Sequence, residues 1–258
     1  MANAEELTYV FVNYLSTRCI NACLRKILEY TPAASVVIDN SGEYEAVASE
    51  LILRPGSNLG FGQAINFAIK KNAMAGKYFV LINPDVEFEA NRFVNSIDSL
   101  TSAQTFTLAL EKPSPGQRCL AFQKDRNILD WSIYNEPSST KAEPALFLTG
   151  FHIAVVNTRD FVEIGGFDSQ FFMYAEDFDL ITRLVYKFSF DRFKYHTFPI
   201  KHISGGSYQG VLGKFKRLLH SYTSNYKFVL KHRLLFRSTT PPRLLALKLA
   251  APKFFKKL

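Results

Sequence analysis

The strongest constraint on the fold is the alternation of short apolar runs with amphipathic segments over the first third of the chain. Runs rich in β-branched and aromatic residues predict four strands, at 8–13, 35–38, 51–53 and 78–82, of which the first two read as buried. Apolar residues recur at helical spacing after Thr17 and again after Gly62. This order of strand, helix, strand, strand, helix and strand is typical of an α/β fold with a mostly parallel central sheet flanked by helices. The 258 residues, 47% of them apolar, can bury one such core and carry an appendage.

Polar residues follow three of the predicted strands at the point where each strand ends. These residues are Asn13, Asp39 and Asp85. In an open α/β sheet, ligands bind outside the carboxyl ends of the strands, so this placement predicts a ligand site at that edge. The alternative is turn chemistry, since Asp and Asn are also residues that turns require.

A cluster of acids precedes a third helical pattern in the stretch GGFDSQFFMYAEDFDLITR, residues 165–183. Glu176, Asp177 and Asp179 come just before apolar residues at helical spacing. We expect a loop that delivers a carboxylate to the first turn of a helix, where the helix dipole favours the ionised form. Such a carboxylate can act as a general base. The alternative is an ordinary N-cap.

The charge of the chain is divided between its two parts. All 23 acidic residues lie at or before Asp191, whereas 15 of the 31 Lys and Arg residues follow it. The last 51 residues alternate these cations with leucine and phenylalanine and predict a basic amphipathic helical extension, 208–258, beside a main domain, 1–207. The three cysteines match no metal-binding spacing, and the short acidic start does not resemble a signal peptide, so we expect a cytoplasmic protein.

Six motifs in this order resemble the family 2 glycosyltransferases, which have the GT-A (Rossmann-like) fold, and within them the rhamnosyltransferase-like members of bacterial surface-polysaccharide and O-antigen synthesis. The motifs are VNY at 12–14, DNSG at 39–42, NLGFGQAIN at 58–66, NPDV at 83–86, the stretch 165–183, and HISGGS at 202–207. The resemblance covers about residues 8–207. It implies an α/β GT-A fold and a transferase that uses a nucleotide-sugar donor.

The resemblance also implies roles for matching residues. The nucleotide-sugar site would be formed by Asn13, Tyr14, Asp39, Asn58, Gly60, Gly62, Asn66 and Asn83. Asp85 matches the last acid of a DxD-like motif that holds Mg²⁺ or Mn²⁺ on the donor diphosphate, although Asn83 replaces the first acid. His202 would be a second metal ligand, with a hydrogen-bonded core histidine as the alternative. Asp177 matches the catalytic base, and Glu176 would orient the base or the acceptor.

The partners follow from the same resemblance and from the charge of the extension. The donor implied is dTDP-rhamnose, with UDP-galactose, UDP-galactofuranose and UDP-glucose left open. The acceptor would be a glycan, in particular a lipid-linked one. The basic extension predicts contact with an anionic membrane on its inner face, or a helix packed on the domain. Two other functions stay open: a non-catalytic sugar-nucleotide or glycan-binding protein of the same fold, and a nucleic-acid-binding protein, for which no recognised motif is present.

Overall fold

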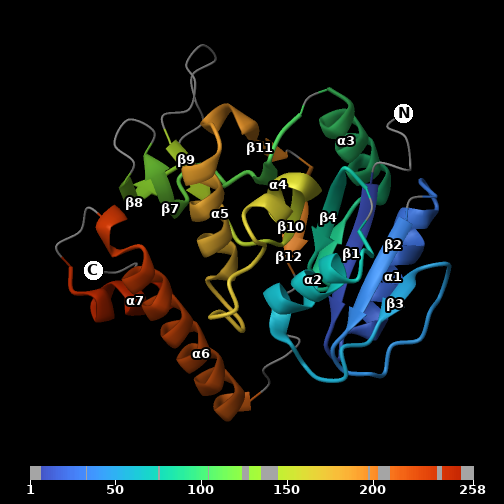
Figure 1. The fold of residues 1–258 in the computed structure, drawn as a ribbon, viewed down its shortest axis with the longest axis horizontal. Helices are drawn as coiled ribbons and strands as arrows, with labels where there is room; N and C mark the ends of the chain where they lie inside the picture. Colours follow the sequence, from blue (N-terminus) through green and yellow to red (C-terminus); the bar gives the residue numbers. More distant parts are fainter. Residues whose placement is uncertain are drawn as a thin grey trace.

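The central layer of the molecule is a seven-stranded sheet (Figure 1). The computed structural model describes residues 7–32, 34–74, 76–103, 105–123, 128–134, 145–196, 198–202, 210–236 and 240–250. The strands of the central sheet are β1 (Leu7–Asn13), β2 (Ala34–Asp39), β3 (Leu51–Leu53), β4 (Tyr78–Ile82), β6 (Leu108–Glu111), β10 (Ile153–Asn157) and β11 (Phe193–His196).

Helices cover both faces of this sheet, and two small sheets complete the described fold. The helices are α1 (Thr17–Leu28), α2 (Gly60–Lys70), α3 (Ala90–Ala103), α4 (Thr158–Glu163), α5 (Glu176–Lys187), α6 (Gly210–Lys231) and α7 (Pro242–Ala250), with 3₁₀ turns at Phe190–Arg192 and Arg233–Leu235. The small sheets are β12–β5, formed by Ile200–His202 and Val86–Phe88, and β8–β7–β9, formed by Ile128–Ile133, Arg118–Gln123 and Ala145–Leu148.

The strand order of the central sheet, β11-β6-β10-β4-β1-β2-β3, brings the predicted polar strand ends to one edge. Strands β1 to β4 are parallel, and β10 is antiparallel to both β4 and β6. The N-terminal end of β10 therefore lies beside the C-terminal ends of β4 and β6. The α/β fold class expected from the sequence, with a mostly parallel sheet between helices, is confirmed.

Alternate residues of the inner strands enter two separate cores, because successive side chains point to opposite faces of a sheet. Val10, Phe79 and Leu81 pack into a cluster with α2 and α5, whereas Tyr9 and Val80 pack into a second cluster with α1 and α3. Both faces are buried, which explains why the strands are continuous apolar runs without alternation.

The apolar run 147–156 divides into two strands of different sheets. Its first part belongs to β9 and its second part to β10, with a turn around Gly150 between them. Gly150 interrupts the extended backbone between the two strands. This turn places Gly150, Phe151 and His152 at the same edge as the ends of β4 and β6.

The two C-terminal helices contribute to the main core. Phe228 and Val229 of α6 and Leu245 of α7 are buried in the cluster that also contains α5. Along the described part of the chain, none of the helices combines the length and the apolar character needed to cross a bilayer. The expected kink at Pro252 lies outside the described residues.

Candidate active site

The acids of the 165–183 stretch lie in the first turn of α5, as expected. The residue at the N-cap position is Ala175, whose side chain makes no cap hydrogen bond, so the N-cap alternative for these acids is wrong. Tyr174 and Ala175 both have left-handed backbone conformations, with φ of 66° and 62°. Two consecutive non-glycine residues in this region store strain. The strained bend aims the start of α5 at the C-terminal edge of the sheet.

Asp177 is half-buried and is held against the turn that precedes β10. Its Oδ1 accepts a hydrogen bond from Phe178 N at 2.8 Å, and the N–H of Phe151 also donates to the carboxylate. Burial raises the pKa of Asp177, while these two N–H groups and the nearby His152 act in the opposite direction. A raised pKa brings a carboxylate closer to the operating pH of a general base.

Asp177 and the turn that carries Asp85 both lie beside residues 150–152. Asn83 N donates to His152 O at 2.8 Å, which fixes the Asn83–Asp85 turn beside the start of β10. The charges of Asp177 and Asp85 both act on the imidazole and help to raise its pKa. Two acids far apart in the sequence therefore belong to one site.

Glu111 and His152 form a pair that the sequence did not reveal. His152 Nδ1 lies 2.8 Å from Glu111 Oε2, and both side chains are partly exposed. Because a carboxylate only accepts, Nδ1 carries a proton. This hydrogen bond is the largest cause of the raised pKa of His152. Two sequence signals could have identified the pair. Glu111 is a polar residue at the end of a strand, β6, and His152 is a polar residue inside an apolar run.

Glu176 is buried beside Asp177 and has one oxygen, Oε2, without a hydrogen-bond partner among the described residues. Burial and the neighbouring Asp177 raise the pKa of Glu176 to about 8. Near neutral pH this carboxyl is therefore mostly protonated.

A divalent cation fits Asp85 when a ligand supplies the other donors. The described residues contain no group of three His, Cys, Asp or Glu side chains that could hold a metal by itself. Mg²⁺ and similar ions are often bound by one or two carboxylates together with substrate phosphates, so a single oxygen donor at the sheet edge suits such a site. The main chain of His202 pairs with Val86, next to Asp85, but its side chain lies outside the described part of the structure.

Asn13 and Asp39 lie together at the ends of β1 and β2. Asn13 Nδ2 donates to Asp39 Oδ1 at 2.9 Å, and both side chains are buried. The Asp39 carboxylate also accepts hydrogen bonds from Ser41, Gly42 and Tyr44. Burial acts to raise the pKa of Asp39, but these bonds outweigh it and the pKa is lowered. A base contact from Asp39 would have to replace one of these bonds, whereas Tyr14, 45% exposed, is accessible.

Four residues expected to shape the donor pocket lie where α2 meets the loop before α5. Asn58 Oδ1 accepts from Gly60 N at 2.9 Å. A Cβ on Gly60 would lie 2.0 Å from Phe172 O, and one on Gly62 would lie 2.8 Å from Phe167 Cβ. Asn66 bonds Phe167 twice, accepting from its N–H and donating to its carbonyl. The donor segment and the loop that carries Asp177 are therefore in direct contact.

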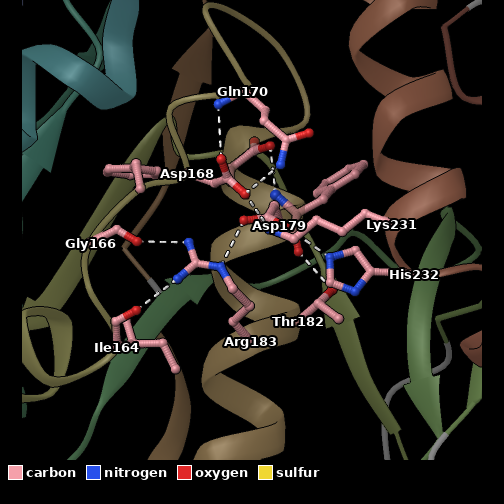
Figure 2. A network of polar contacts seen from close by, with 12 residues as sticks. Ile164, Gly166, Asp168, Gln170, Asp179, Thr182, Arg183, Lys231 and His232 are labelled. Atoms are coloured by element: carbon pink, nitrogen blue, oxygen red, sulfur yellow. Dashed lines mark hydrogen bonds and ion pairs between the residues drawn. The ribbon is translucent and has the colours of Figure 1, made fainter.

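Asp179, two residues beyond Asp177, is the centre of a charged network (Figure 2). It is fully buried, and its oxygens accept from Arg183, Lys231 and His232 at 2.8, 2.6 and 2.8 Å. Arg183 also donates to the carbonyls of Ile164 and Gly166. Burial acts to raise the pKa of Asp179, but the cations outweigh it and lower the pKa to about 2. The network joins α5, the preceding loop and the end of α6.

No family model and no curated protein matches this sequence. Solved structures do match the fold. A mannosyltransferase from Pyrobaculum calidifontis, in complex with GDP-Man and Mn²⁺, aligns with 95% of this chain and 68% of its own at 13% identity and a TM-score of 0.53. S. aureus TarS 1–349 aligns with 98% and 73% at 10% identity and a TM-score of 0.57.

Glucosyl-3-phosphoglycerate synthase from Mycobacterium tuberculosis, in complex with Mn²⁺, UDP and phosphoglyceric acid, gives a similar result. It aligns with 88% of this chain and 78% of its own at 10% identity and a TM-score of 0.56. At such low identity the likeness concerns the fold. The chain therefore has the α/β fold of the GT-A type that these three glycosyltransferases share.

Proposed function

We propose that this protein is a metal-dependent, inverting glycosyltransferase that moves a sugar from a nucleotide diphosphate to a hydroxyl group. The observation that supports the proposal is that residues 150–152, at the C-terminal edge of the sheet, lie beside both Asp177 and the Asn83–Asp85 turn. A transferase of this class needs one acid near the donor diphosphate and another near the acceptor, and this edge supplies both.

Asp177 is the general base in this proposal. It takes the proton of the acceptor hydroxyl as the hydroxyl oxygen attacks the anomeric carbon, while the bond from that carbon to the diphosphate breaks. Attack from the face opposite the leaving group inverts the anomeric centre. Glu176, protonated beside Asp177, keeps the pair from carrying two negative charges.

Asp85 holds the divalent cation, with His202 as a second ligand. When bound, Mg²⁺ or Mn²⁺ offsets the charge that develops on the departing diphosphate. Two of the similar structures, those of the mannosyltransferase and the synthase, contain Mn²⁺, which supports a divalent cation here.

The donor site extends from Asp85 towards β1 and β2. Asn13 and Asp39 hold the turn that would receive the base, and the exposed ring of Tyr14 can stack on it. The 58–66 segment and Asn83 would line the sugar and phosphate region. The motif resemblance favours dTDP-rhamnose as the donor. The similar structures contain GDP-Man and UDP, and a UDP-sugar is the alternative donor.

The acceptor is a glycan, carried on a lipid at the inner membrane face. The support is the surface of the first half of α6, where Phe215, Leu218 and Leu219 are exposed beside the exposed Lys216 and Arg217. Apolar side chains among cations suit the interface of an anionic membrane. The second half of α6 packs on the domain through Phe228 and Val229, and the first half is the part proposed to contact the membrane.

The decisive experiment compares Asp177→Asn with the wild type. We expect thermal-shift screening of dTDP-, UDP- and GDP-sugars with Mn²⁺ to find one donor that stabilises both proteins. Asp177→Asn should then bind this donor with unchanged affinity by calorimetry while its turnover falls at least about a hundredfold, in line with loss of a general base. Glu163→Gln, a surface change in α4, is the control. Full activity of Asp177→Asn would refute the base, and donor binding without turnover by the wild type would favour a non-catalytic protein.

The membrane contact has its own experiment. The wild type should co-sediment with vesicles rich in phosphatidylglycerol and not with phosphatidylcholine vesicles. The triple change of Phe215, Leu218 and Leu219 to Ser should abolish co-sedimentation, whereas Leu234→Ser, at a 99% exposed leucine elsewhere, should not. Binding to generic duplex DNA without binding to vesicles would instead assign the basic surface to nucleic acid.

A further inference from the structure

Gly150 lies where the candidate base and His152 come close to each other. An ideal Cβ on Gly150 would lie 3.5 Å from Asp177 Oδ2 and 3.8 Å from His152 Nε2. No other atom of the described residues, apart from its chain neighbours, comes within 4 Å of that position. The space that a side chain at position 150 would fill is therefore bordered by a carboxylate oxygen of Asp177 and an imidazole nitrogen of His152.

The imidazole that forms this wall has a fixed orientation. Glu111 Oε2 accepts from His152 Nδ1 at 2.8 Å, and the His152 main chain is hydrogen-bonded to Asn83 N and to Gly150 O. With Nδ1 committed to Glu111, Nε2 is the nitrogen that faces the space. A second charged side chain that holds a histidine in this way is a common means of fixing its orientation in reactive sites.

The chemistry of the two walls suits an alcohol. The attacking hydroxyl group can donate its hydrogen to Asp177 Oδ2, and a neighbouring hydroxyl group of a sugar can donate to His152 Nε2, which accepts when the ring proton is on Nδ1. The side chains of His152 and Glu111 are 35% and 29% exposed, so this pair is in contact with solvent.

We propose that the attacking hydroxyl of the acceptor binds in the space beside Gly150, between Asp177 and His152, and that His152 is an acceptor-binding residue positioned by Glu111. This inference rests on the transferase activity proposed above. In the reaction, the acceptor O–H proton passes to Asp177 Oδ2 and the oxygen forms the new bond to the anomeric carbon. The bond between that carbon and the diphosphate oxygen breaks, and its electron pair leaves with the diphosphate.

If the acceptor binds here, the size of the side chain at position 150 determines whether its hydroxyl group fits. A methyl group at Gly150 meets both walls at ordinary van der Waals distance, and the backbone there is not left-handed. Gly150→Ala should therefore fold, while its methyl group occupies the space that a carbon-bound hydroxyl needs. Water is smaller and can still approach Asp177 beside the methyl group.

The test compares the rate at which the donor sugar is transferred to an alcohol with the rate at which the donor is hydrolysed by water. The donor found by thermal shift is incubated with and without octyl glycosides of common hexoses as acceptors, and both free sugar and glycosylated product are measured. For Gly150→Ala we expect the ratio of transfer to hydrolysis to fall at least about tenfold. A general loss of structure would lower both reactions and leave the ratio unchanged.

The two polar walls are tested by the same assay. His152→Ala should raise the KM for the octyl glycoside about tenfold with little change in the KM for the donor, and Glu111→Gln should shift it in the same direction by less. Glu163→Gln serves as the control. An unchanged ratio in a Gly150→Ala protein that keeps the wild-type melting temperature, or a raised donor KM with an unchanged acceptor KM for His152→Ala, overturns the proposal. A wild type that neither transfers nor hydrolyses any donor would instead refute the transferase itself.

Discussion

His232 Nε2 lies 2.8 Å from Asp179 Oδ1, so the end of α6 contacts the first turn of the helix that carries the candidate base. The same oxygen also accepts from Lys231, which reaches Asp168 in the preceding loop as well. The basic extension is therefore part of the support of the site (Figure 2).

Loss of the Asp179 carboxylate should destabilise the fold strongly. Asp179→Asn leaves Arg183 and Lys231 beside a buried neutral amide, and breaking a buried ion pair costs about 3 kcal/mol or more of unfolding free energy. Urea unfolding followed by circular dichroism measures this change. The matched control is Lys187→Met, which removes a half-exposed pair with Glu163 and should cost less than about 1 kcal/mol. Equal effects of the two changes would mean that the network does not hold α5.

Glu176 should make the protein less stable as the pH rises. Its pKa is raised to about 8 in the folded state, above the ordinary value of 4.5, so the unfolded chain loses its proton first. Stability is thus complete below about pH 4.5 and is lost progressively as the pH rises towards 8.

Glu176→Gln removes this titration. We expect the variant to be more stable than the wild type at pH 8, with the difference shrinking towards pH 5, in urea titrations at several pH values. A difference that stays constant with pH would show that Glu176 titrates normally.

Gly60 should tolerate no side chain. Its φ is +74° and a Cβ would lie 2.0 Å from Phe172 O, so Gly60→Ala adds a backbone clash to an unfavourable conformation. Gly56 is the matched control, because its φ is +82° and a Cβ there meets nothing within 4 Å. Gly56→Ala should cost about 1 kcal/mol, from the left-handed backbone alone. Gly60→Ala should cost several times more in the same unfolding assay, and similar costs would argue against the contact with Phe172.

Asp85 should link donor binding to the divalent cation. In wild-type protein we expect the stabilising donor to raise the melting temperature more with Mn²⁺ than with EDTA, because the cation joins the diphosphate to the carboxylate. Asp85→Asn should lose the Mn²⁺-dependent part of this shift. Glu87→Gln, two residues away at an exposed pair with Lys201, should retain it. A Mn²⁺-dependent shift that survives in Asp85→Asn would place the cation elsewhere.

Much of the fold follows from local sequence patterns. The strands of the first half are apolar runs that end in Asn13, Asp39 and Asn83–Asp85, and each was recognisable because a buried parallel strand needs a continuous apolar stretch. The position of Asp177 in the first turn of α5 also followed from periodicity.

The remaining features depend on contacts between distant residues. Glu111 and His152 meet only because β6 and β10 are neighbours in the sheet, and no local pattern encodes that pairing. Lys231 belongs to the basic extension expected from the sequence, and only the packing of α6 on α5 shows that Lys231 and His232 both bind Asp179. Such partners are set by tertiary structure.

The side-chain amide of Asn66 forms a two-bond clamp on the main chain of Phe167. These two bonds join the segment that would select the donor to the loop that leads to Asp177. Both bonds use main-chain atoms of Phe167, so a replacement of residues 58–66 that lacks Asn66 loses them, whereas a change of the Phe167 side chain does not remove either group. The identity of residue 66, and not that of residue 167, therefore determines whether the two segments stay joined.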